Sequence, residues 1–176
     1  MSLHLHVGPM FSGKSSESIT RATAYRSVGI PIIVVKPVLD TRDKHVSAHH
    51  GIGSMQCVSV DTLCQVTTMD EYASAQAIFV EEAQFLSDVV HVVRAMLRDG
   101  KEVFVYALDS DAKQRSWASN ILDLVTDATV LRKHVAMCTY CGKPAPYTVC
   151  SERLPDTQVL IGGDEIYSAV CLTHLH

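Results

Sequence analysis

The sequence predicts an α/β fold in which a mainly parallel sheet carries helices on both faces and a small metal-binding module follows. Short apolar runs of strand length alternate with segments of helical periodicity, and strands joined through helices pair in parallel. A glycine-containing loop separates the first apolar run from the first helical segment. After residue 136 the helical periodicity disappears, and Cys and His residues occur in pairs. We therefore expect an α/β domain over residues 1–135 and a separate module over residues 136–176.

Composition argues against several classes of function. The 176 residues include 15 Lys and Arg against 19 Asp and Glu, and the resulting net charge of −4 disfavours broad binding to nucleic acid or anionic membrane. No apolar run is long enough to span a bilayer and no basic-then-apolar signal opens the chain, so we expect a cytoplasmic protein without a membrane partner. Six cysteines in such a chain indicate reduced thiols and a possible metal site.

The first expected elements are a strand at 3–7 and a helix at 15–28. The strand alternates in polarity, and the helical segment lacks proline and glycine until Gly29 can end it. The β-branched run at 31–35 is typical of a strand buried on both faces. The polar stretch from 40 to 53 is interpreted as a long loop.

The later elements continue the alternation of strand and helix. They are expected as a short strand at 56–60, a weak helix at 61–75, a buried strand at 77–80, a helix capped by Ser87 or Asp88 and ending at Asp99, a strand at 103–108, a helix at 117–125 and a strand at 129–135.

The loop after the first strand fits the phosphate-binding pattern G-x-x-x-x-G-K-[ST]. In such a loop successive backbone N–H groups surround an anion, and the helix that follows adds its positive N-terminal end. The alternative is a strand-to-helix turn that binds nothing, but the expected strand and helix on either side favour phosphate binding. The loop consists of Gly8, Pro9, Met10, Phe11, Ser12, Gly13, Lys14 and Ser15.

An acidic pair, Glu81 and Glu82, follows the buried strand at 77–80. Ligands of parallel sheets bind at the carboxyl ends of the strands, where the phosphate loop and Asp109 also fall. One carboxylate at this place can meet Mg²⁺ and its neighbour can accept a proton from an attacking hydroxyl. A solvated turn is the alternative, and the nearby phosphate loop favours the catalytic interpretation.

The last segment carries two ligand pairs with the spacing of a structural zinc site. Three thiolates and one imidazole complete a tetrahedral set and leave no position for substrate, so the metal is expected to be structural. His176 is an alternative to His174 that the sequence leaves open, and His4 and His6 are interpreted as sheet-face residues rather than ligands. The predicted zinc ligands are Cys138, Cys141, Cys171 and His174.

Taken in order, these motifs resemble the type II thymidine kinase family, which includes cytosolic and poxviral enzymes. The resemblance covers nearly the whole chain. The matching segments are Gly8–Ser15, Asp40–Arg42, Glu82–Phe85, Ala107–Asp109, Tyr147–Thr148, Ile161–Gly163 and Tyr167, together with the zinc ligands.

The resemblance implies transfer of the γ-phosphoryl group of ATP to the 5′-hydroxyl of thymidine, with Mg²⁺ as cofactor. It also implies a RecA-like α/β domain, a zinc-held domain whose lasso loop covers the substrate, and a homotetramer. Carried over by position, Glu82 would accept the hydroxyl proton, while Lys14 and Arg42 would stabilise the moving phosphoryl group. Ser15 and Glu81 would organise Mg²⁺. The positions that match the family's nucleoside site are Met10, Phe85, Leu108, Trp117, Thr148, Leu160, Gly162 and Tyr167.

Two departures from the family pattern bear on specificity. Glu81 stands where the family usually has Asp, and Ala112 stands at an aromatic position of the base pocket. Trp117, at a family phenylalanine position, can compensate for Ala112. Ala112 predicts a roomier pocket, and the two departures leave open a kinase with broader deoxynucleoside specificity.

Three other functions remain as alternatives. A phosphate-loop ATPase would use Glu82 to activate water and would turn over ATP without nucleoside. A zinc-containing nucleic-acid-binding module is disfavoured because no basic cluster surrounds Cys138 or Cys171. A diverged, inactive kinase retained as an oligomeric partner is the third.

Overall fold

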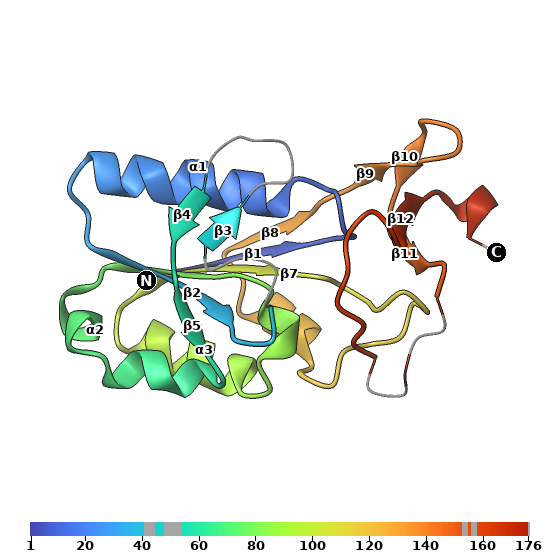
Figure 1. Ribbon diagram of the computed structural model, residues 1–176. Coiled ribbons are helices and arrows are strands. Elements are labelled where there is room, and N and C mark those ends of the chain that lie inside the picture. Colours follow the sequence, from blue (N-terminus) through green and yellow to red (C-terminus); the bar gives the residue numbers. More distant parts are fainter. Residues whose placement is uncertain (41–44, 48–53, 153–154, 156–157, 176) are drawn as a thin grey trace.

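The structure is a computed structural model that describes residues 1–40, 45–47, 54–152, 155 and 158–175. Its centre is a six-stranded sheet with the order β5-β2-β6-β7-β1-β8, in which every neighbouring pair is parallel (Figure 1). The α/β class expected from the alternating pattern is confirmed. The strands are β1 (Ser2–Val7), β2 (Ile32–Pro37), β5 (Val58–Val60), β6 (Ala77–Val80), β7 (Glu102–Ala107) and β8 (Val130–Lys133).

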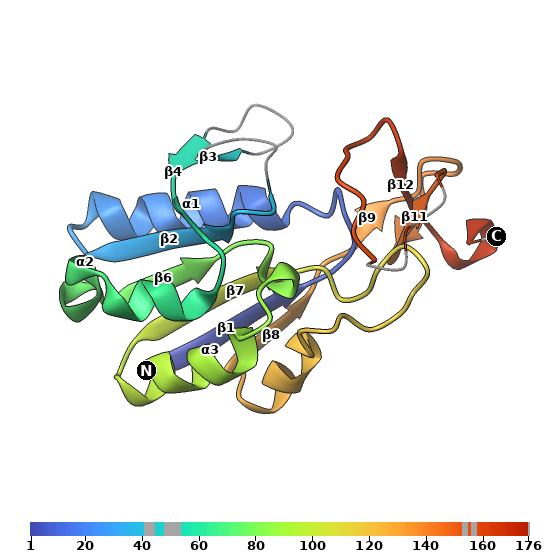
Figure 2. The ribbon, with the colours of Figure 1, turned by 60° about the horizontal axis from the view of Figure 1, so that its bottom comes forward.

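Helices cover both faces of this sheet. Helix α1 (Lys14–Ser27) lies along one face, and α3 (Val89–Arg98) lies along the other with the short helix α2 (Asp70–Ser74) nearby (Figures 1 and 2). The 3₁₀ helices η1 (Leu63–Thr68) and η3 (Ile121–Thr126) pack against α3. The core therefore has two halves, one on each side of the sheet.

The alternation of side chains along β1 and β7 sorts residues between the two halves of the core. Leu3 and Leu5 belong to the half under α3, while Phe104 and Tyr106 belong to the half under α1. Because successive strand residues point to opposite faces, His4 and His6, which alternate with these leucines, point toward α1. His6 stacks on Tyr106, with ring centroids 4.6 Å apart. As predicted, both histidines of β1 lie on a face of the sheet.

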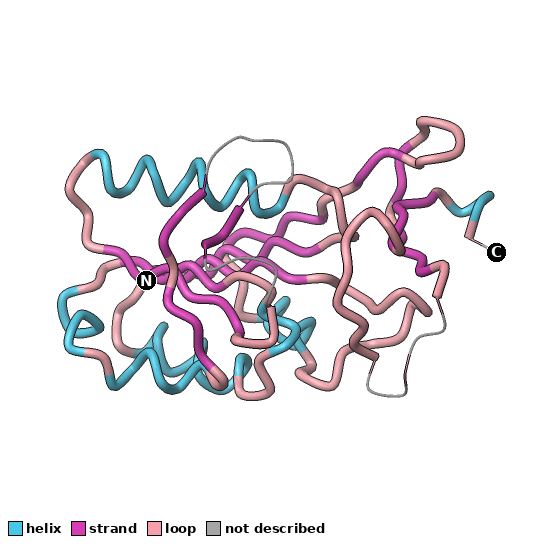
Figure 3. Tube along the Cα trace, in the orientation of Figure 1, coloured by secondary structure: helices cyan, strands magenta, loops and turns pink. Residues whose placement is uncertain are grey.

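The carboxyl ends of the parallel strands meet at one edge of the sheet, and two small antiparallel sheets lie beyond that edge (Figures 1 and 3). One pairs β9 (Ala136–Met137) with β10 (Pro144–Ala145), and the other pairs β11 (Tyr147–Cys150) with β12 (Tyr167–Val170). The 3₁₀ helix η4 (Leu172–His174) follows β12. The division into domains at residue 135 stays a prediction.

The structure corrects three expected elements. Part of the loop expected at 40–53 is a strand, β3 (His45–Ser47), which pairs antiparallel with β4 (Ser54–Gln56). The single strand expected at 56–60 is also wrong. Gln56 is the last residue of β4, Cys57 lies between the strands, and β5 begins at Val58. The helix expected at 117–125 is instead the 3₁₀ helix η3, which begins only at Ile121. The weak helix expected at 61–75 is present as η1 and α2.

The difference between the helix expected at 117–125 and the observed η3 has a local cause. Asn120 adopts a left-handed conformation with φ of 52°, which interrupts any helix that starts near Trp117. Propensity alone did not reveal this break, because Asn is only mildly unfavourable within helices. In the described part of the chain, no helix combines the length and apolar character needed to cross a membrane.

Candidate active site

The phosphate-loop segment lies between β1 and α1, as its position in the sequence predicts. Gly13 precedes α1 with φ of 81°, a conformation that favours glycine. Gly8 is required for another reason, since a Cβ at this position would come within 2.6 Å of the backbone oxygen of His134. The loop therefore packs closely against the chain that leaves β8.

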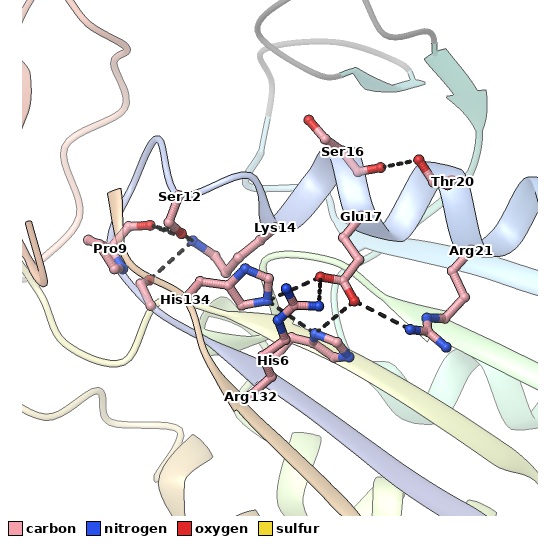
Figure 4. Close-up of polar contacts among 11 residues, drawn as sticks. His6, Pro9, Ser12, Lys14, Ser16, Glu17, Thr20, Arg21, Arg132 and His134 are labelled. Atoms are coloured by element: carbon pink, nitrogen blue, oxygen red, sulfur yellow. Dashed lines mark hydrogen bonds and ion pairs between the residues drawn. The ribbon is translucent and has the colours of Figure 1, made fainter. Parts of the chain in front are cut away.

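The side chain of Lys14 lies inside this loop (Figure 4). Its Nζ donates hydrogen bonds to the backbone oxygens of Gly8, at 3.1 Å, and Pro9, at 2.6 Å. Burial lowers the pKa of Lys14 to about 8, although the carboxylates of Glu82 and Asp109 act in the opposite direction. The ammonium thus stays mostly protonated at neutral pH and places a positive charge within the loop.

Glu81 is a buried carboxylate at the end of β6. Its side chain is almost fully enclosed, and its Oε1 has no hydrogen-bond partner. Burial raises the pKa of Glu81 to about 7, against hydrogen bonding from the hydroxyls of Ser18 and Ser15. Carboxylate and hydroxyl oxygens are suitable ligands for Mg²⁺, directly or through water. The unpartnered oxygen of Glu81 beside Ser15 therefore fits a magnesium position.

Glu82, the next residue, has a different environment. It adopts a left-handed conformation with φ of 46°, and its Oε2 accepts a hydrogen bond of 2.7 Å from Nε2 of Gln84. Gln84 is buried, and its Oε1 accepts a bond of 2.9 Å from the backbone N–H of Leu108 at the end of β7. Gln84 thus connects two strand ends and holds the Glu82 carboxylate, a role that the sequence analysis did not identify.

One pocket opens beside Glu82. It encloses about 600 Å³ including its open mouth, and it is lined mainly by apolar side chains. All eight residues predicted from the family's nucleoside site line it, although they come from distant segments. They are Met10, Phe85, Leu108, Trp117, Thr148, Leu160, Gly162 and Tyr167. Arg42, the other predicted catalytic residue, lies outside the described residues.

The aromatic part of the pocket is built from Phe85 and Trp117. Their rings meet edge to face with centroids 5.4 Å apart, and Trp117 is largely buried. Ala112 also lines the pocket and contributes only a methyl group there. Trp117 therefore supplies an aromatic wall, while no bulky side chain fills the pocket at position 112.

Two hydrogen bonds connect the segments around the pocket. The backbone N–H of Met10, in the phosphate loop, donates to Oγ1 of Thr148 on β11 at 2.9 Å. The hydroxyl of Tyr167 on β12 donates to the backbone oxygen of Leu160. The first bond connects the loop after β1 to β11, and the second connects β12 to the chain that precedes it.

Asp111 forms a third connection, which the sequence analysis also missed. Its buried carboxylate accepts bonds from Nε of Arg115, at 2.7 Å, and from Nε2 of Gln158, at 2.9 Å. Although burial opposes it, hydrogen bonding from Arg115, Gln158 and Lys113 lowers the pKa of Asp111. The Gln158 amide also donates to the backbone oxygen of Ser116 at 3.2 Å. These hydrogen bonds hold Gln158 against the loop that follows β7.

The predicted zinc ligands form a compact cluster beyond the sheet edge. Nδ1 of His174 lies 3.5 Å from Sγ of Cys138 and 3.3 Å from Sγ of Cys171, and the Sγ atoms of Cys141 and Cys171 are 3.7 Å apart. These separations match the spacing of about 3.5–3.8 Å that neighbouring ligands take around tetrahedral zinc. Against the opposing effect of burial, nearby backbone N–H groups lower the pKa of Cys138 to about 6, which favours the thiolate that metals bind. The cluster is compatible with zinc and includes His174, while His176 lies outside the described residues.

Comparison with known proteins agrees with this arrangement. The family profile described as "Thymidine kinase" matches residues 1–175. The chain is 33% identical to a thymidine kinase of Monkeypox virus over 171 residues, which are 96% of this chain and 93% of that protein. Thymidine kinases of Vaccinia virus (strain Western Reserve) and Variola virus are 32% identical over the same shares of the chains. The chain therefore belongs to the thymidine kinase family.

Proposed function

We propose that this thymidine kinase transfers the γ-phosphoryl group of ATP to the 5′-hydroxyl of thymidine, with Glu82 as the base. The observation that carries the proposal is the position of Glu82, which lines the apolar pocket. Among the nearby carboxylates, Glu82 also does most to raise the pKa of the buried Lys14. A hydroxyl bound in the pocket would therefore meet a proton acceptor on the side where the phosphate loop lies. General-base assistance of this kind is most effective when the base is held in place, which Gln84 does here.

The phosphate side of the site supplies charge and position. Phosphoryl transfer depends mainly on these two effects, because the transferred group passes through a loose transition state. Lys14 and Arg42 would stabilise negative charge on the moving group. Glu81 and Ser15 would hold Mg²⁺, directly or through water, and the ion when bound neutralises charge on the phosphate oxygens.

The pocket supplies recognition of the nucleoside. Its apolar lining suits a flat base, and pockets of this kind use a few polar groups to fix orientation. We propose that backbone groups of Leu160 and Gly162 read the edge of the pyrimidine, while Phe85, Trp117 and Tyr167 bound its faces. The chain from Gln158 to Gly162, which Asp111 contacts at Gln158, would close over the base and exclude water that otherwise hydrolyses ATP.

Three further features belong to the same proposal. The Cys₃His cluster would hold structural Zn²⁺, because four protein ligands leave no open position for substrate. The enzyme would act as a homotetramer in the cytoplasm, as the family resemblance implies. Nucleic acid is not expected as a partner, since the net charge is −4.

Product analysis tests the proposed reaction. The purified protein is incubated with Mg-ATP and each natural deoxynucleoside in turn, and nucleoside monophosphates are measured. We expect thymidine 5′-monophosphate, and negligible ATP turnover until nucleoside is added. ATP hydrolysis at the same rate without nucleoside would favour the ATPase alternative, and no monophosphate from any nucleoside would refute a kinase.

Broader deoxynucleoside specificity is a second candidate, favoured by the small side chain of Ala112 in the pocket wall. It predicts that pyrimidine nucleosides with bulky 5-substituents are phosphorylated, and that Ala112→Phe removes this activity more than activity toward thymidine. Refusal of bulky 5-substituents by the unchanged enzyme would refute it.

A further inference from the structure

A second group of metal-ligand side chains lies on the α1 face of the sheet, next to the phosphate loop. His6 comes from β1, Glu17 from the first turns of α1, and His134 from the chain just after β8 (Figure 4). One ligand atom from each residue lies within 4.8 Å of the others. The sequence gives no spacing signal for this group, because its members are far apart along the chain.

The distances within the group are close to those around one metal ion. Nδ1 of His6 and Nε2 of His134 share a hydrogen bond of 3.1 Å, which a bound ion would replace. These two atoms lie 3.6 Å from Oε1 and Oε2 of Glu17, respectively. A separation of 3.6 Å is too long for a hydrogen bond. Zn²⁺ with N and O ligands in tetrahedral geometry separates neighbouring ligand atoms by about 3.3–3.5 Å. The carboxylate is thus placed for a shared ion rather than for direct bonding to either imidazole.

The protonation of the two histidines also suits a metal. Burial lowers the pKa of His6 to about 4 and also lowers that of His134, although Glu17 acts in the opposite direction in both cases. Both imidazoles are therefore neutral near pH 7, which is the form that binds a metal. Because Nδ1 of His6 and Nε2 of His134 share a hydrogen bond, one of these nitrogens carries a proton, which must move to the other nitrogen of its ring before both can bind the ion. Stacking on Tyr106 holds the ring of His6, and a bond of 2.7 Å from the N–H of His134 to the backbone oxygen of Val7 holds that residue.

Two arginines compete for the same carboxylate. Arg132 Nη1 lies 2.9 Å from Oε2 of Glu17, and Arg21 Nη2 lies 3.4 Å from Oε1. The side chain of Arg132 is 59% exposed and can turn toward solvent when a cation takes the carboxylate. The guanidinium of Arg21 instead lies over the ring of Phe104, 5.4 Å from its centroid, and stays near Glu17. The same exposed side gives an ion a path to the group. Competition from Arg132 should weaken metal binding without preventing it.

We propose that His6, Glu17 and His134 form a second metal site for Zn²⁺ or a similar transition-metal ion, distinct from the Cys₃His cluster. Two imidazoles and one carboxylate are a ligand set that such ions accept, with water in the fourth position. A bound ion ties together β1, the start of α1 and the chain after β8. Because that chain packs against Gly8, the ion also supports the phosphate loop.

A Co²⁺ titration of the metal-free full chain tests the proposal. Cobalt bound by thiolates gives a charge-transfer absorption in the near ultraviolet, whereas cobalt bound only by nitrogen and oxygen does not. We expect two ions per chain by elemental analysis, with the thiolate band saturating at the first. The second ion should also raise the melting temperature further.

Variants separate this site from adventitious binding. His6→Gln and His134→Gln should each weaken the second ion at least tenfold and leave the thiolate band unchanged. His4→Gln, on the same strand but paired with Glu102, should change neither, and Arg132→Gln should strengthen the second ion. If the two histidines had only a structural role, Arg132→Gln would not strengthen binding of the second ion. A second ion that all these variants bind equally, or no second ion in the unchanged protein at millimolar metal, overturns the proposal.

A measurement on the unchanged protein decides the question if the histidine variants do not fold. Imidazole ¹⁵N shifts are followed by NMR as the second equivalent of Zn²⁺ is added. Changes confined to His6 and His134 support the site, whereas changes at other histidines or none at all overturn it.

Discussion

The candidate active site has a proposed phosphate end, at the loop before α1, and a proposed nucleoside end, at the apolar pocket, and the two are built in different ways. At the phosphate end, the key groups come from two short continuous segments, Gly8–Ser15 and Glu81–Glu82, each fixed to the end of a strand. At the nucleoside end, residues from Met10 to Tyr167 converge from separate segments and are connected by single hydrogen bonds. The first end therefore depends on the sheet, whereas the second depends on contacts made by loops and on the Cys₃His cluster.

The largest expected effect is at the phosphate end and concerns the chemical step alone. Glu82→Gln keeps the size of the side chain but removes the proton acceptor, so kcat should fall by about 10²–10⁴-fold. ATP affinity and melting temperature should change little, since Lys14 and the loop remain. Steady-state formation of thymidine monophosphate measures the effect, and Glu71→Gln on the exposed side of α2 is the matched control. Near-normal turnover in Glu82→Gln would remove this residue from the chemistry.

Loss of a ligand from the Cys₃His cluster should affect the two ends unequally. Cys171→Ser removes one predicted zinc ligand, and we expect thymidine binding to be lost while ATP binding is weakened less. The reason is that Lys14 and Glu81 lie next to the ends of sheet strands, although Met10 and Phe11 of the loop also contact the module. Limited proteolysis should cut the chain after residue 136 before it cuts the sheet. Cys64→Ser, which changes an exposed thiol outside the cluster, should behave as the unchanged protein. Equal loss of ATP and thymidine binding would show that the two ends are not independent.

The connection between Asp111 and Gln158 should affect only the nucleoside end. Asp111→Asn removes a charge that accepts several hydrogen bonds, each worth about 1.5–3 kcal/mol when a charged group is involved. We expect KM for thymidine to rise about tenfold with a smaller change in kcat and an unchanged KM for ATP. Gln158→Ala should act in the same direction, and the double variant should be less than additive because the two residues share one contact.

Asp123→Asn, an exposed carboxylate on η3, is the control for this pair. A rise in KM for both substrates in Asp111→Asn would indicate a general loss of structure. Strict additivity of the two changes would argue against a direct connection.

The same contrast explains what the sequence can and cannot predict. The buried strands and the phosphate-loop segment were predictable, because hydrophobic runs and a short motif are local signals. The grouping of Cys138, Cys141, Cys171 and His174 was predictable from their pairwise spacing. Gln84, Asp111 and the group around His6 were not, because an ordinary polar residue gains its role only from the partner that folding brings to it. Strand β3 was missed since a polar, histidine-containing segment carries no strand periodicity.

The smallest expected effect is the pH dependence of stability that arises from Glu81. Its pKa is about 7 in the folded protein and about 4.5 without burial, so the fold favours the protonated form. This stabilising contribution is full below pH 4.5 and is lost as pH rises through 7. Between pH 6.5 and 8 the loss amounts to about 1 kcal/mol, which corresponds to a fall of about 2–4 °C in melting temperature. Two other groups act with the opposite sign near this window. Cys138, with a pKa of about 6 in the folded protein, adds stability as pH rises above 6, and Lys14 adds stability as pH rises through 8, whereas His6 destabilises the fold only below pH 6.5.

The Glu81 contribution is therefore measured as a difference between the slopes of two proteins. Thermal melts of the nucleotide-free protein in matched buffers give each slope. Glu81→Gln should remove the Glu81 contribution from the slope, and Glu71→Gln should retain it. An unchanged slope in Glu81→Gln would mean that the carboxylate at the end of β6 is ionised without cost, and the phosphate end would then lack the buried acid that distinguishes it from the nucleoside end.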